Sequence, residues 1–491
     1  MTGPDDPHRQ LGPDPAAPDE NDPVVPELDD ETSEIIPDSP PLDLLTVETI
    51  LNRRWPETRI EPTLDRITAL LDLLGNPQTA APVIQIAGTN GKTSVSRMID
   101  ALLSGLGLRT GRFTSPHLQL VTERISIDGE PISAEQYVRT YADIAPYIDI
   151  VDARSEQDGG VPLSKFEILT AMAYAAFADA PVDVMVIETG LGGTWDSTNV
   201  VDSTVAVITP IGMDHQDYLG DTMASVAGNK AGIINAGATA VIGPQTAEAM
   251  EVLLARAVDQ DIAVARYDSE FTVLRRDLAV GGQRLELQGL SAVYSDIFLP
   301  LTGEHQAQNA SLALAAVEAF LGAGRSRELD ADSIRDAFAT VSSPGRLERV
   351  RTSPTILIDA AHNPHGATAL AAALRSEYHF GRLVGVLAVM ADKDAEGIMA
   401  ALAGSFDEVV VTVNSSPRSM PAEELADIAR DIFGDANVQV ADRMDDAIAL
   451  AVELAETGGP GEGDPHGAGV LITGSVVSAG DGRTLAGLTP S

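Results

Sequence analysis

A glycine-rich run followed by Lys-Thr carries the most direct chemical meaning in this sequence. Residues 88–93 read Gly-Thr-Asn-Gly-Lys-Thr and stand between an apolar, β-branched stretch and a stretch with helical spacing. Glycines at such a turn let backbone N–H groups and a helix N-terminus approach a phosphate closely. In a loop of this kind Lys92 reaches the β- and γ-phosphates of a nucleotide, and the Thr93 hydroxyl binds Mg²⁺. The run therefore predicts ATP binding.

The spacing of this run departs from the general phosphate-loop pattern. That pattern has a glycine five residues before Gly91, where this chain has Ile86, and the glycine falls instead at Gly88. The other interpretation is a glycine-rich turn followed by a chance Lys-Thr pair. The predicted strand before it and the predicted helix after it favour the phosphate loop.

Two further residues have types suited to holding a metal. Glu188 ends an apolar run and precedes a glycine-rich turn, and carboxylates at the ends of parallel strands face the binding crevice. Magnesium takes a few oxygen ligands together with water and substrate phosphates. His215 follows another predicted strand, beside Asp214. A strand-end acid can also cap a helix, and a histidine is often only hydrogen-bonded, so both alternatives stay open.

Lysine is rare in this chain. It occurs at positions 92, 165, 230 and 393, whereas the other 28 of the 32 basic residues are arginine. Lysine differs from arginine in that its pKa is readily shifted and its neutral amine reacts. Where any surface cation suffices the chain uses arginine, so the lysines are candidates for chemistry.

The elements that must position these residues follow an α/β pattern. Short apolar runs at residues 83–87, 184–187 and 204–208 alternate with longer helical stretches such as 94–106 and 168–178. Alternation of this kind predicts a mostly parallel sheet covered on both faces. Residues 273–299 alternate with period two around a Gly-Gly turn, which predicts a small antiparallel sheet.

The pattern restarts after residue 343 and predicts a second, smaller Rossmann-like α/β domain. Its predicted strands are residues 355–359, 383–390, 408–413 and 470–473. We therefore expect a disordered, acidic, proline-rich tail at 1–45, an ATP-binding domain at 46–343, a hinge at 344–346 and a C-terminal domain at 347–491.

Composition narrows the class of protein. The formal charge is −41, which disfavours nucleic acid because phosphate backbones need clustered Lys and Arg. The chain has no cysteine, and no apolar run long enough to span a membrane. The first fourteen residues lack the basic and apolar regions of an export signal, so the cytoplasm is the expected compartment.

The variant loop resembles that of the folylpolyglutamate synthase/dihydrofolate synthase family, within the Mur ligase superfamily. Further stretches match the folate enzymes in order from about residue 47 to 475. They are residues 114–118 (Thr-Ser-Pro-His-Leu), 123–125 (Glu-Arg-Ile), 166–167 (Phe-Glu), 188–193 (Glu-Thr-Gly-Leu-Gly-Gly), 196–199 (Asp-Ser-Thr-Asn), 213–215 (Met-Asp-His), 230–233 (Lys-Ala-Gly-Ile), 303–306 (Gly-Glu-His-Gln) with Asn309, 344–346 (Pro-Gly-Arg) and 359–364 (Asp-Ala-Ala-His-Asn-Pro). Single stretches are weak, but their shared order is specific.

The resemblance implies a role for each of these positions. Mg²⁺, two ions in the family, is held by Ser115, Glu188, His215 and Lys230, the last as a lysine carbamoylated by CO₂. ATP is held by Thr89, Asn90, Gly91, Lys92, Thr93, Asn309, Arg346 and Asp359. The catalytic set is Lys92, Lys230 and His362, with His362 near the incoming glutamate. The pteroate pocket is formed by Lys165, Phe166, Glu167, Trp195, Asp196 and Ser197.

The chain departs from the family pattern at three places. Thr194 replaces an arginine that is common after the Gly-Gly pair, and Gly228-Asn229 replace acidic residues before the lysine. Ala360 replaces a glycine, a mild change unless its φ is positive. Trp55 and Trp195 are the two tryptophans, and stacking on a pterin and ordinary packing are equally good interpretations of them.

The resemblance predicts an ATP-dependent carbon–nitrogen ligase with small-molecule substrates: dihydropteroate, folates and L-glutamate. We expect a bifunctional enzyme that forms an acyl phosphate and then an amide, acting as a monomer. The nearest alternative is a Mur ligase that extends a UDP-linked peptide, but only about forty ordered residues precede the loop, too few for the usual nucleotide-sugar domain. A nucleotide-binding switch and an inactive paralogue are further alternatives.

Overall fold

The computed structural model describes residues 42–55, 61–322, 328–457 and 467–490. The chain divides into residues 1–41 and 42–491, and every element below belongs to the second unit. Most of the tail predicted for residues 1–45 thus lies outside the described residues. The first described helix, α1 (Leu44–Asn52), begins at Leu44 after an Asp43 cap.

The larger sheet has eight strands in the described residues, ordered β4-β3-β2-β5-β1-β6-β7-β8. From β2 to β8 neighbouring strands run parallel, and β3 and β4 are antiparallel additions at one edge. The strands are β1 (Val83–Ala87), β2 (Thr110–Phe113), β3 (Ile125–Ile127), β4 (Glu130–Pro131), β5 (Val184–Glu188), β6 (Val205–Ile208), β7 (Thr239–Ile242) and β8 (Ala263–Arg266). The predicted mostly parallel sheet is confirmed.

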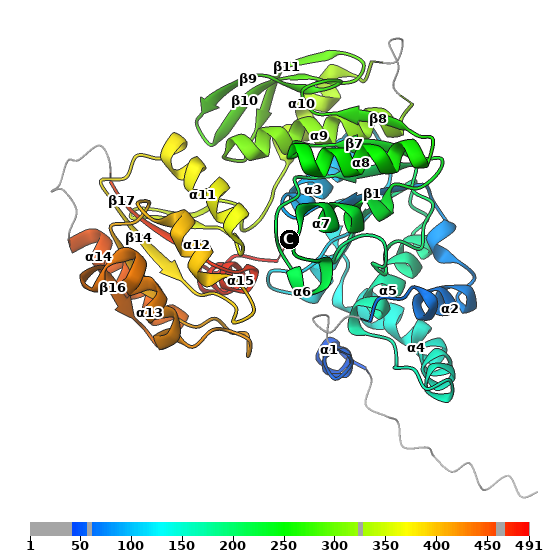
Figure 1. The fold of residues 1–491 in the computed structure, drawn as a ribbon, viewed down its shortest axis with the longest axis horizontal. Helices are drawn as coiled ribbons and strands as arrows, with labels where there is room; N and C mark the ends of the chain where they lie inside the picture. Colours follow the sequence, from blue (N-terminus) through cyan, green and yellow to red (C-terminus); the bar gives the residue numbers. More distant parts are fainter. Residues whose placement is uncertain (1–41, 56–60, 323–327, 458–466, 491) are drawn as a thin grey trace, which may run out of the picture. The chain divides into compact units, whose positions relative to one another are not determined.

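Helices cover both faces of this sheet (Figure 1). Successive side chains of a strand point to opposite faces, so Ile84 and Ile86 of β1 lie in one core and Val83 in another. The core of Ile84 includes α3 (Lys92–Gly105), α9 (Glu304–Phe320) and α10 (Ala331–Thr340). The opposite face is covered by α1, α2 (Asp65–Leu73), α4 (Ala134–Gln157), α5 (Lys165–Asp179), α7 (Met223–Lys230) and α8 (Ala247–Asp259).

A small antiparallel sheet of β9 (Thr272–Ala279), β10 (Gly282–Gln288) and β11 (Val293–Leu299) packs on α9 and α10 (Figure 1). This is the antiparallel excursion expected at residues 273–299. Its inward side chains, among them Leu285 and Ile297, join the core that also contains α3. The sheet therefore buttresses the helix that follows the phosphate loop.

The C-terminal part contains a six-stranded sheet in the described residues, ordered β12-β13-β17-β14-β15-β16. All neighbours are parallel except the pair β12 and β13. The strands are β12 (Glu348–Thr352), β13 (Thr355–Ile358), β14 (Arg382–Leu387), β15 (Glu408–Val411), β16 (Val438–Val440) and β17 (Ala468–Thr473). One face packs on α11 (Pro364–Glu377), α12 (Ala395–Leu402) and α13 (Ala422–Phe433), and the other on α14 (Met444–Thr457) and α15 (Val476–Leu485).

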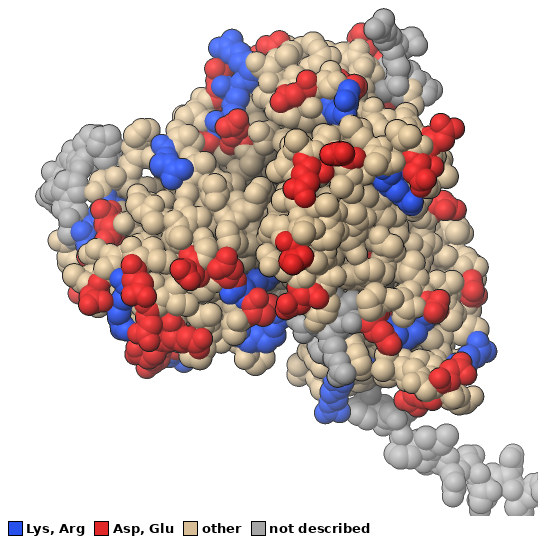
Figure 2. Space-filling model, in the orientation of Figure 1, with Lys and Arg blue, Asp and Glu red and all other residues tan. Residues whose placement is uncertain are grey.

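The acidic composition is visible on the surface. Figure 2 shows Asp and Glu side chains spread across the face in view, gathered most densely over the C-terminal helices, with Lys and Arg in isolated groups. In the described part of the chain, no helix is both long and apolar enough to cross a membrane.

Candidate active site

The phosphate loop connects β1 to α3, as its sequence predicts. Gly91 precedes α3 with φ +88°, and Gly88 has φ +152°. A Cβ at Gly88 would lie 1.8 Å from Thr209 Oγ1, so the turn requires glycine there. Ile86, where the general pattern has glycine, is a fully buried residue of β1. The glycine comes two residues later because the strand continues through Ile86.

The side chains of this loop fold back over its own backbone. Lys92 Nζ donates to the carbonyls of Gly88 and Thr89, at 3.2 and 3.4 Å. Thr89 Oγ1 donates to the Gly212 carbonyl at 2.9 Å, which fastens the loop to the segment that follows β6. The Thr89 and Asn90 N–H groups donate to the Pro210 carbonyl, at 3.1 and 3.4 Å. The ammonium group thus lies over the turn that leads into the N-terminus of α3, and a helix N-terminus is where phosphates bind.

Glu188 ends β5 with its carboxylate buried against the start of α3. Thr93 Oγ1 donates to both carboxylate oxygens, at 3.0 and 3.1 Å. Burial raises the pKa of Glu188 to about 7, although Lys92 and the Thr93 hydrogen bond oppose the shift. Ser115 follows the neighbouring strand β2 and lines the same cavity. The two predicted metal ligands therefore lie at adjacent carboxyl ends of the sheet.

Lys230 is the last residue of α7 and is only 4% exposed. Its Nζ donates to the Gly88 carbonyl at 2.8 Å, which puts the amine directly beneath the phosphate loop. Burial, helped by the charge of Lys92, lowers the pKa of Lys230 to about 7. A large fraction of the side chain is therefore the neutral, nucleophilic amine near pH 7.

Two departures from the family pattern lie against each other. The Thr194 N–H and hydroxyl donate to the Asn229 carbonyl at 2.9 and 3.0 Å. The Asn229 side-chain oxygen accepts from the Gly193 N–H at 2.9 Å. A polar interlock thus holds the end of α7 to the glycine-rich loop after β5. Ala360, the third departure, does not have a positive φ, so alanine is unstrained there.

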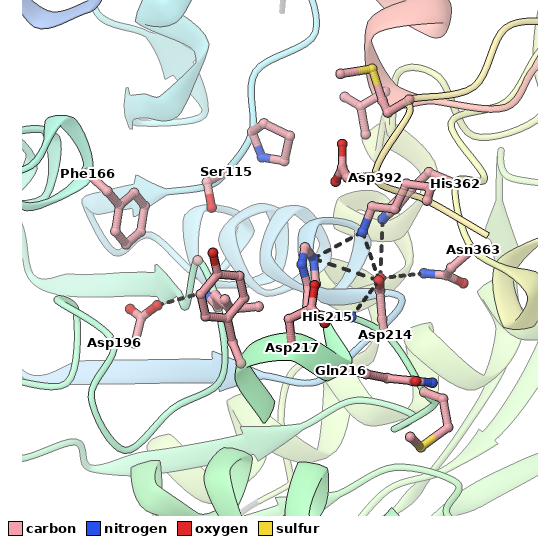
Figure 3. Close-up of a pocket in the computed structure, with 18 of the residues that line it drawn as sticks. Ser115, Phe166, Asp196, Asp214, His215, Gln216, Asp217, His362, Asn363 and Asp392 are labelled. Carbon is pink, nitrogen blue, oxygen red and sulfur yellow. Dashed lines mark hydrogen bonds and ion pairs between the residues drawn. The ribbon is translucent and has the colours of Figure 1, made fainter. Parts of the chain in front are cut away.

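The segment after β6 places Asp214 and His215 at the junction with the C-terminal domain (Figure 3). Lys393 Nζ lies 2.8 Å from Asp214 Oδ1 and 3.2 Å from His215 Nε2. Asn363 Nδ2 donates to Asp214 Oδ2 at 3.0 Å, and His362 Nε2 lies 3.9 Å from the same oxygen. Asp214 therefore gathers three side chains of the other domain.

The electrostatics of this junction keep its carboxylate charged. Burial alone raises the pKa of Asp214, but His215, Lys393 and His362 outweigh it and hold that pKa below its usual range. Burial lowers the pKa of His215 and of His362 to about 4 each. Both imidazoles are neutral near pH 7, and His215 Nε2 accepts from Lys393 Nζ in this structure.

The phosphate loop itself also reaches the C-terminal domain. The Asn90 and Asn363 amides exchange two hydrogen bonds of 3.2 Å, and Asn90 Nδ2 lies 2.8 Å from His365 Nδ1. Asn363 is the N-cap of α11. Asn90, expected to bind ATP, is therefore a contact between domains in this structure.

The other predicted ATP contacts lie around the same loop. Arg346 lines the smaller cavity, and the buried Asp359 beside it accepts from the Leu347 and Ala361 N–H groups at 2.9 and 2.8 Å. Burial raises the pKa of Asp359, with Arg346 opposing. Asn309 is buried behind the turn, and a Cβ on Gly91 would lie 2.8 Å from its Oδ1.

A cavity of about 1130 Å³ opens beside the phosphate loop and contains most of the predicted pteroate residues. Phe166 and Asp196 stand on one side of it, across from Asp214 and His362 (Figure 3). Trp195 lines it with a partly buried ring. Its remaining predicted members are Glu167 and Ser197. Lys165 is not among its lining residues and donates instead to Asn52 Oδ1 at 2.8 Å.

Two acidic members of this cavity are already satisfied by protein donors. Glu167 accepts from Arg66 Nε at 3.1 Å and from the Ser164 N–H at 2.8 Å, where it closes the cap of α5. Asp196 accepts from the Leu191 N–H at 2.8 Å and from Thr198. Both acids therefore shape the walls of the cavity, and Arg66 brings a guanidinium to the same wall.

The four predicted metal ligands, Ser115, Glu188, His215 and Lys230, all line a second cavity of about 200 Å³. In the described ranges, no group of three or more His, Asp or Glu side chains is arranged to hold a metal. The donor types fit Mg²⁺ once Lys230 supplies oxygen, because an ammonium group has no lone pair. Glu188 is bonded to a hydroxyl rather than to a cation, which leaves its charge for a divalent ion.

Sequence reasoning missed roles for Arg66, Asp214, Asn363 and Lys393. Asp214 and Asn363 lie inside stretches that match the family, and Lys393 is one of four lysines. No sequence motif contains both Lys393 and either of the other two residues. Asp214 and Lys393 are 179 residues apart, so their contact depends on how the domains pack. Rarity of lysine was the one signal that pointed at Lys393.

Comparisons with known proteins agree with this geometry. The model of the Mur ligase middle domain matches residues 164–317, and that of the Mur ligase glutamate ligase domain matches residues 345–476. Fold and site together are those of an ATP-dependent ligase that joins an amino acid to a carboxylate.

Individual relatives extend over nearly the whole chain. The dihydrofolate synthase/folylpolyglutamate synthase of Mycobacterium tuberculosis is 58% identical over 91% of this chain and 94% of its own length. A solved structure of folylpolyglutamate synthase from that organism, complexed with ADP, has TM-score 0.87 and 58% identity, covering 91% of this chain and 99% of that one. Escherichia coli FolC in complex with DHPP and ADP has TM-score 0.76 and 28% identity, with 90% and 97% covered. The chain belongs to the folylpolyglutamate synthase/dihydrofolate synthase family of the Mur ligase superfamily.

Proposed function

We propose that this chain is a bifunctional dihydrofolate synthase and folylpolyglutamate synthase, which ligates L-glutamate to dihydropteroate and to glutamylated folates. The observation that carries the proposal is the meeting of two cavities. Ser115, Asp214, His215 and His362 line both the cavity of the phosphate loop and the larger one beside it. A nucleotide in the first and a carboxylate in the second would meet at these residues.

The reaction has two steps that conserve atoms and charge. A carboxylate oxygen of the pterin substrate attacks the γ-phosphorus of ATP, the bond to the β–γ bridging oxygen breaks, and ADP leaves with that oxygen. The glutamate amine then attacks the acyl carbon, and phosphate leaves with the acyl oxygen. Phosphoryl transfer depends mainly on positioning and charge neutralisation, and Lys92 supplies a fixed positive charge beside the loop.

Proton transfer at the second step falls to His362. Its Nδ1 lies 2.9 Å from the Ala360 carbonyl oxygen, which can only accept, so Nδ1 carries the hydrogen. Nε2 is then a free lone pair that faces the junction of the two cavities. A neutral imidazole in this place accepts the proton that the amine must lose before it attacks.

We infer that the enzyme binds two Mg²⁺ ions and carries a carbamoylated Lys230. Ser115, Glu188, His215 and the carbamate would hold the metal, which when bound neutralises phosphate charge. The neutral Lys230 amine adds to CO₂ and loses one proton, which converts a cation into an oxygen ligand. Support comes from the burial of Lys230 and the lowering of its pKa to about 7.

We propose that the enzyme is a monomer with small-molecule substrates and no nucleic-acid partner, in keeping with its acidic surface. A Mur ligase with a UDP-linked peptide substrate and an inactive paralogue are the competing proposals. The hydrogen bonds of Thr194 and Asn229 argue against an inactive paralogue, because the two departures from the family pattern contact each other in one polar interlock.

An assay of ADP release with purified protein and Mg-ATP tests the function. Release should depend on L-glutamate together with dihydropteroate, and separately on L-glutamate together with a reduced folate. Turnover with neither pterin substrate overturns the proposal, and turnover with a UDP-linked muramoyl peptide instead would establish the Mur alternative.

A further inference from the structure

The segment at residues 114–120 connects β2 to the 3₁₀ helix η2 (Val121–Arg124) and contains no helix or strand of its own. Ser115, one of the proposed metal ligands, stands near its start and lines the nucleotide cavity. The Ser115 N–H is among the groups that interact with the Glu188 carboxylate, another proposed ligand. The position of Ser115 therefore depends on what holds this irregular segment.

One acid of the same domain binds the second half of the segment. The Glu123 carboxylate, only 4% exposed, accepts from the N–H groups of Leu118, Gln119 and Leu120, at 2.8, 3.0 and 3.0 Å. Backbone N–H groups in a buried turn need such partners, because leaving one unpaired costs about as much as a lost hydrogen bond. Leu118, Gln119 and Leu120 are therefore held together as one unit.

The outer side of this unit packs on α15 of the C-terminal domain. The Leu118 side chain joins the apolar core that also contains Ala479 and Val476. A Cβ at Gly480 would lie 2.0 Å from the Leu118 carbonyl oxygen, so the glycine is what lets the helix approach the segment. The segment belongs to the ATP-binding domain, yet it is packed into the core of the other domain.

A polar cluster around Gln119, which we call the Gln119 latch, extends this contact. Gln119 Oε1 accepts from Arg483 Nε at 3.0 Å, and Gln119 Nε2 donates to the Thr484 hydroxyl at 3.2 Å and to the Leu488 carbonyl at 2.9 Å. Arg483 is 4% exposed and forms an ion pair with Glu348 of β12. A hydrogen bond from a charged, buried guanidinium is stronger than a neutral one, so the C-terminal domain holds this side chain firmly.

The latch is close to Ser115 along the chain. Only four residues separate Gln119 from Ser115, and Pro116 between them has a fixed φ, which limits how far the backbone can adjust. A displacement at Gln119 is therefore passed on to Ser115. Without the latch, Ser115 would be anchored from the side of β2 alone, and its distance from Glu188 would vary.

We propose, on the basis of the metal site inferred above, that Gln119 and Arg483 are positioning residues whose bond holds Ser115 beside Glu188 while the two domains are in contact. The coupling is reciprocal, because an ion bound at Ser115 favours contact of the segment with α15 as much as that contact favours the ion. Partners that orient a metal ligand in this way commonly affect metal affinity by tenfold or more, on the order of the effect of a ligand itself.

Binding of ADP in the presence of Mg²⁺ or of EDTA separates this role from general support of the fold. In a calorimetric titration of the full chain, we expect Gln119→Ala to raise the Kd of ADP with Mg²⁺ by about tenfold. In EDTA the Kd should change by no more than about twofold, because the phosphate loop at the start of α3 does not depend on the latch. Gln119→Glu keeps an acceptor for Arg483, so it should retain more of the Mg²⁺-dependent affinity than alanine does, and it serves as the test if the alanine variant does not fold.

Leu120→Ala is the matched control. Leu120 is the next residue, its side chain is 45% exposed, and alanine keeps the N–H bond to Glu123, so this variant should bind ADP as the unmutated protein does. Ser115→Ala shows whether Gln119 acts through the serine. In the double variant the Mg²⁺-dependent loss should stay at about tenfold, since two residues that act on one contact are not additive.

Three results would overturn the proposal. Gln119→Ala might lose ADP affinity equally with Mg²⁺ and with EDTA, which would mean that the latch supports the fold and not the metal site. Unchanged affinity under both conditions in a folded variant would show that Ser115 needs no latch. Losses that multiply in the double variant to about a hundredfold would show independent action. If the unmutated protein binds ADP equally well with Mg²⁺ and with EDTA, the proposed metal site itself fails, which is a distinct outcome.

Discussion

Lys230 Nζ donates to the carbonyl oxygen of Gly88 at 2.8 Å, so the one buried lysine in the described chain lies directly under the phosphate loop. This contact links two features that are 142 residues apart in the sequence. It puts an amine with a lowered pKa next to the phosphates that Lys92 and α3 would hold. The predictions about Lys230 follow from that position.

Replacement of Lys230 by alanine should nearly abolish ligation. The variant loses the proposed carbamate oxygens and one of the two lysine amines that donate to the Gly88 carbonyl, at a cost of about 1 kcal/mol in stability. We expect kcat to fall by about a hundredfold or more, the usual scale for removing a group that acts in the transition state. Full activity in a Lys230→Ala protein with an unchanged melting temperature would exclude the carbamate.

The pH dependence of carbamoylation gives an independent check. The pKa of Lys230 is lowered to about 7, so the fraction of neutral amine rises from about a tenth at pH 6 to about nine tenths at pH 8. Enzyme stripped of CO₂ should therefore regain activity about ten times faster at pH 8 than at pH 6, with dissolved CO₂ held constant. A ¹³C carbamate resonance with ¹³CO₂ would report the modification directly. Recovery that is independent of CO₂ contradicts the modification.

The interlock of Asn229 with the Gly193–Thr194 backbone should hold Lys230 in register. Asn229→Ala removes the acceptor for the Gly193 N–H, which costs about 1–3 kcal/mol, and should lower kcat as α7 shifts. Gly228→Ala is the matched control, because a Cβ there meets no atom closer than 4.0 Å, on Val252. Thermal melting and kcat of the two variants should differ clearly. Equal behaviour would show that the interlock does not position the lysine.

Trp195 offers a test of the larger cavity. Its partly buried ring lines the wall that also contains Phe166, and an aromatic side chain there can stack on a pterin. Trp195→Ala should raise the KM for dihydropteroate by about fivefold to tenfold, the scale of one aromatic contact, while the KM for ATP stays unchanged. If the KM for ATP rises together with that for dihydropteroate, the substitution has disturbed the glycine-rich loop after β5 and the effect is not due to lost stacking.

Much of this architecture follows from local sequence patterns. The apolar run at residues 83–87 forms β1 with those bounds, and residues 273–299 form the antiparallel sheet. The short strand β16 has no comparable run, because three residues leave too little pattern, and its pairing with β15 depends on the sheet around it.

The candidate site divides in the same way. The phosphate loop, Glu188 and Lys230 stand in recognisable motifs and converge as expected. The ion pair of Lys393 with Asp214 and that of Arg66 with Glu167 join residues from separate elements, and no spacing rule specifies such contacts. Asn90 is a further contact that the sequence did not predict, since its side chain bonds to Asn363 of the other domain.

The most direct test of the account is the mass of the product formed from dihydropteroate, L-glutamate and Mg-ATP. The account predicts a product one glutamyl residue heavier than dihydropteroate, formed in equal amount with ADP and phosphate, and further glutamyl additions when a reduced folate is supplied. ADP formation without a glutamylated product, or no reaction of either pterin substrate with glutamate, would contradict it.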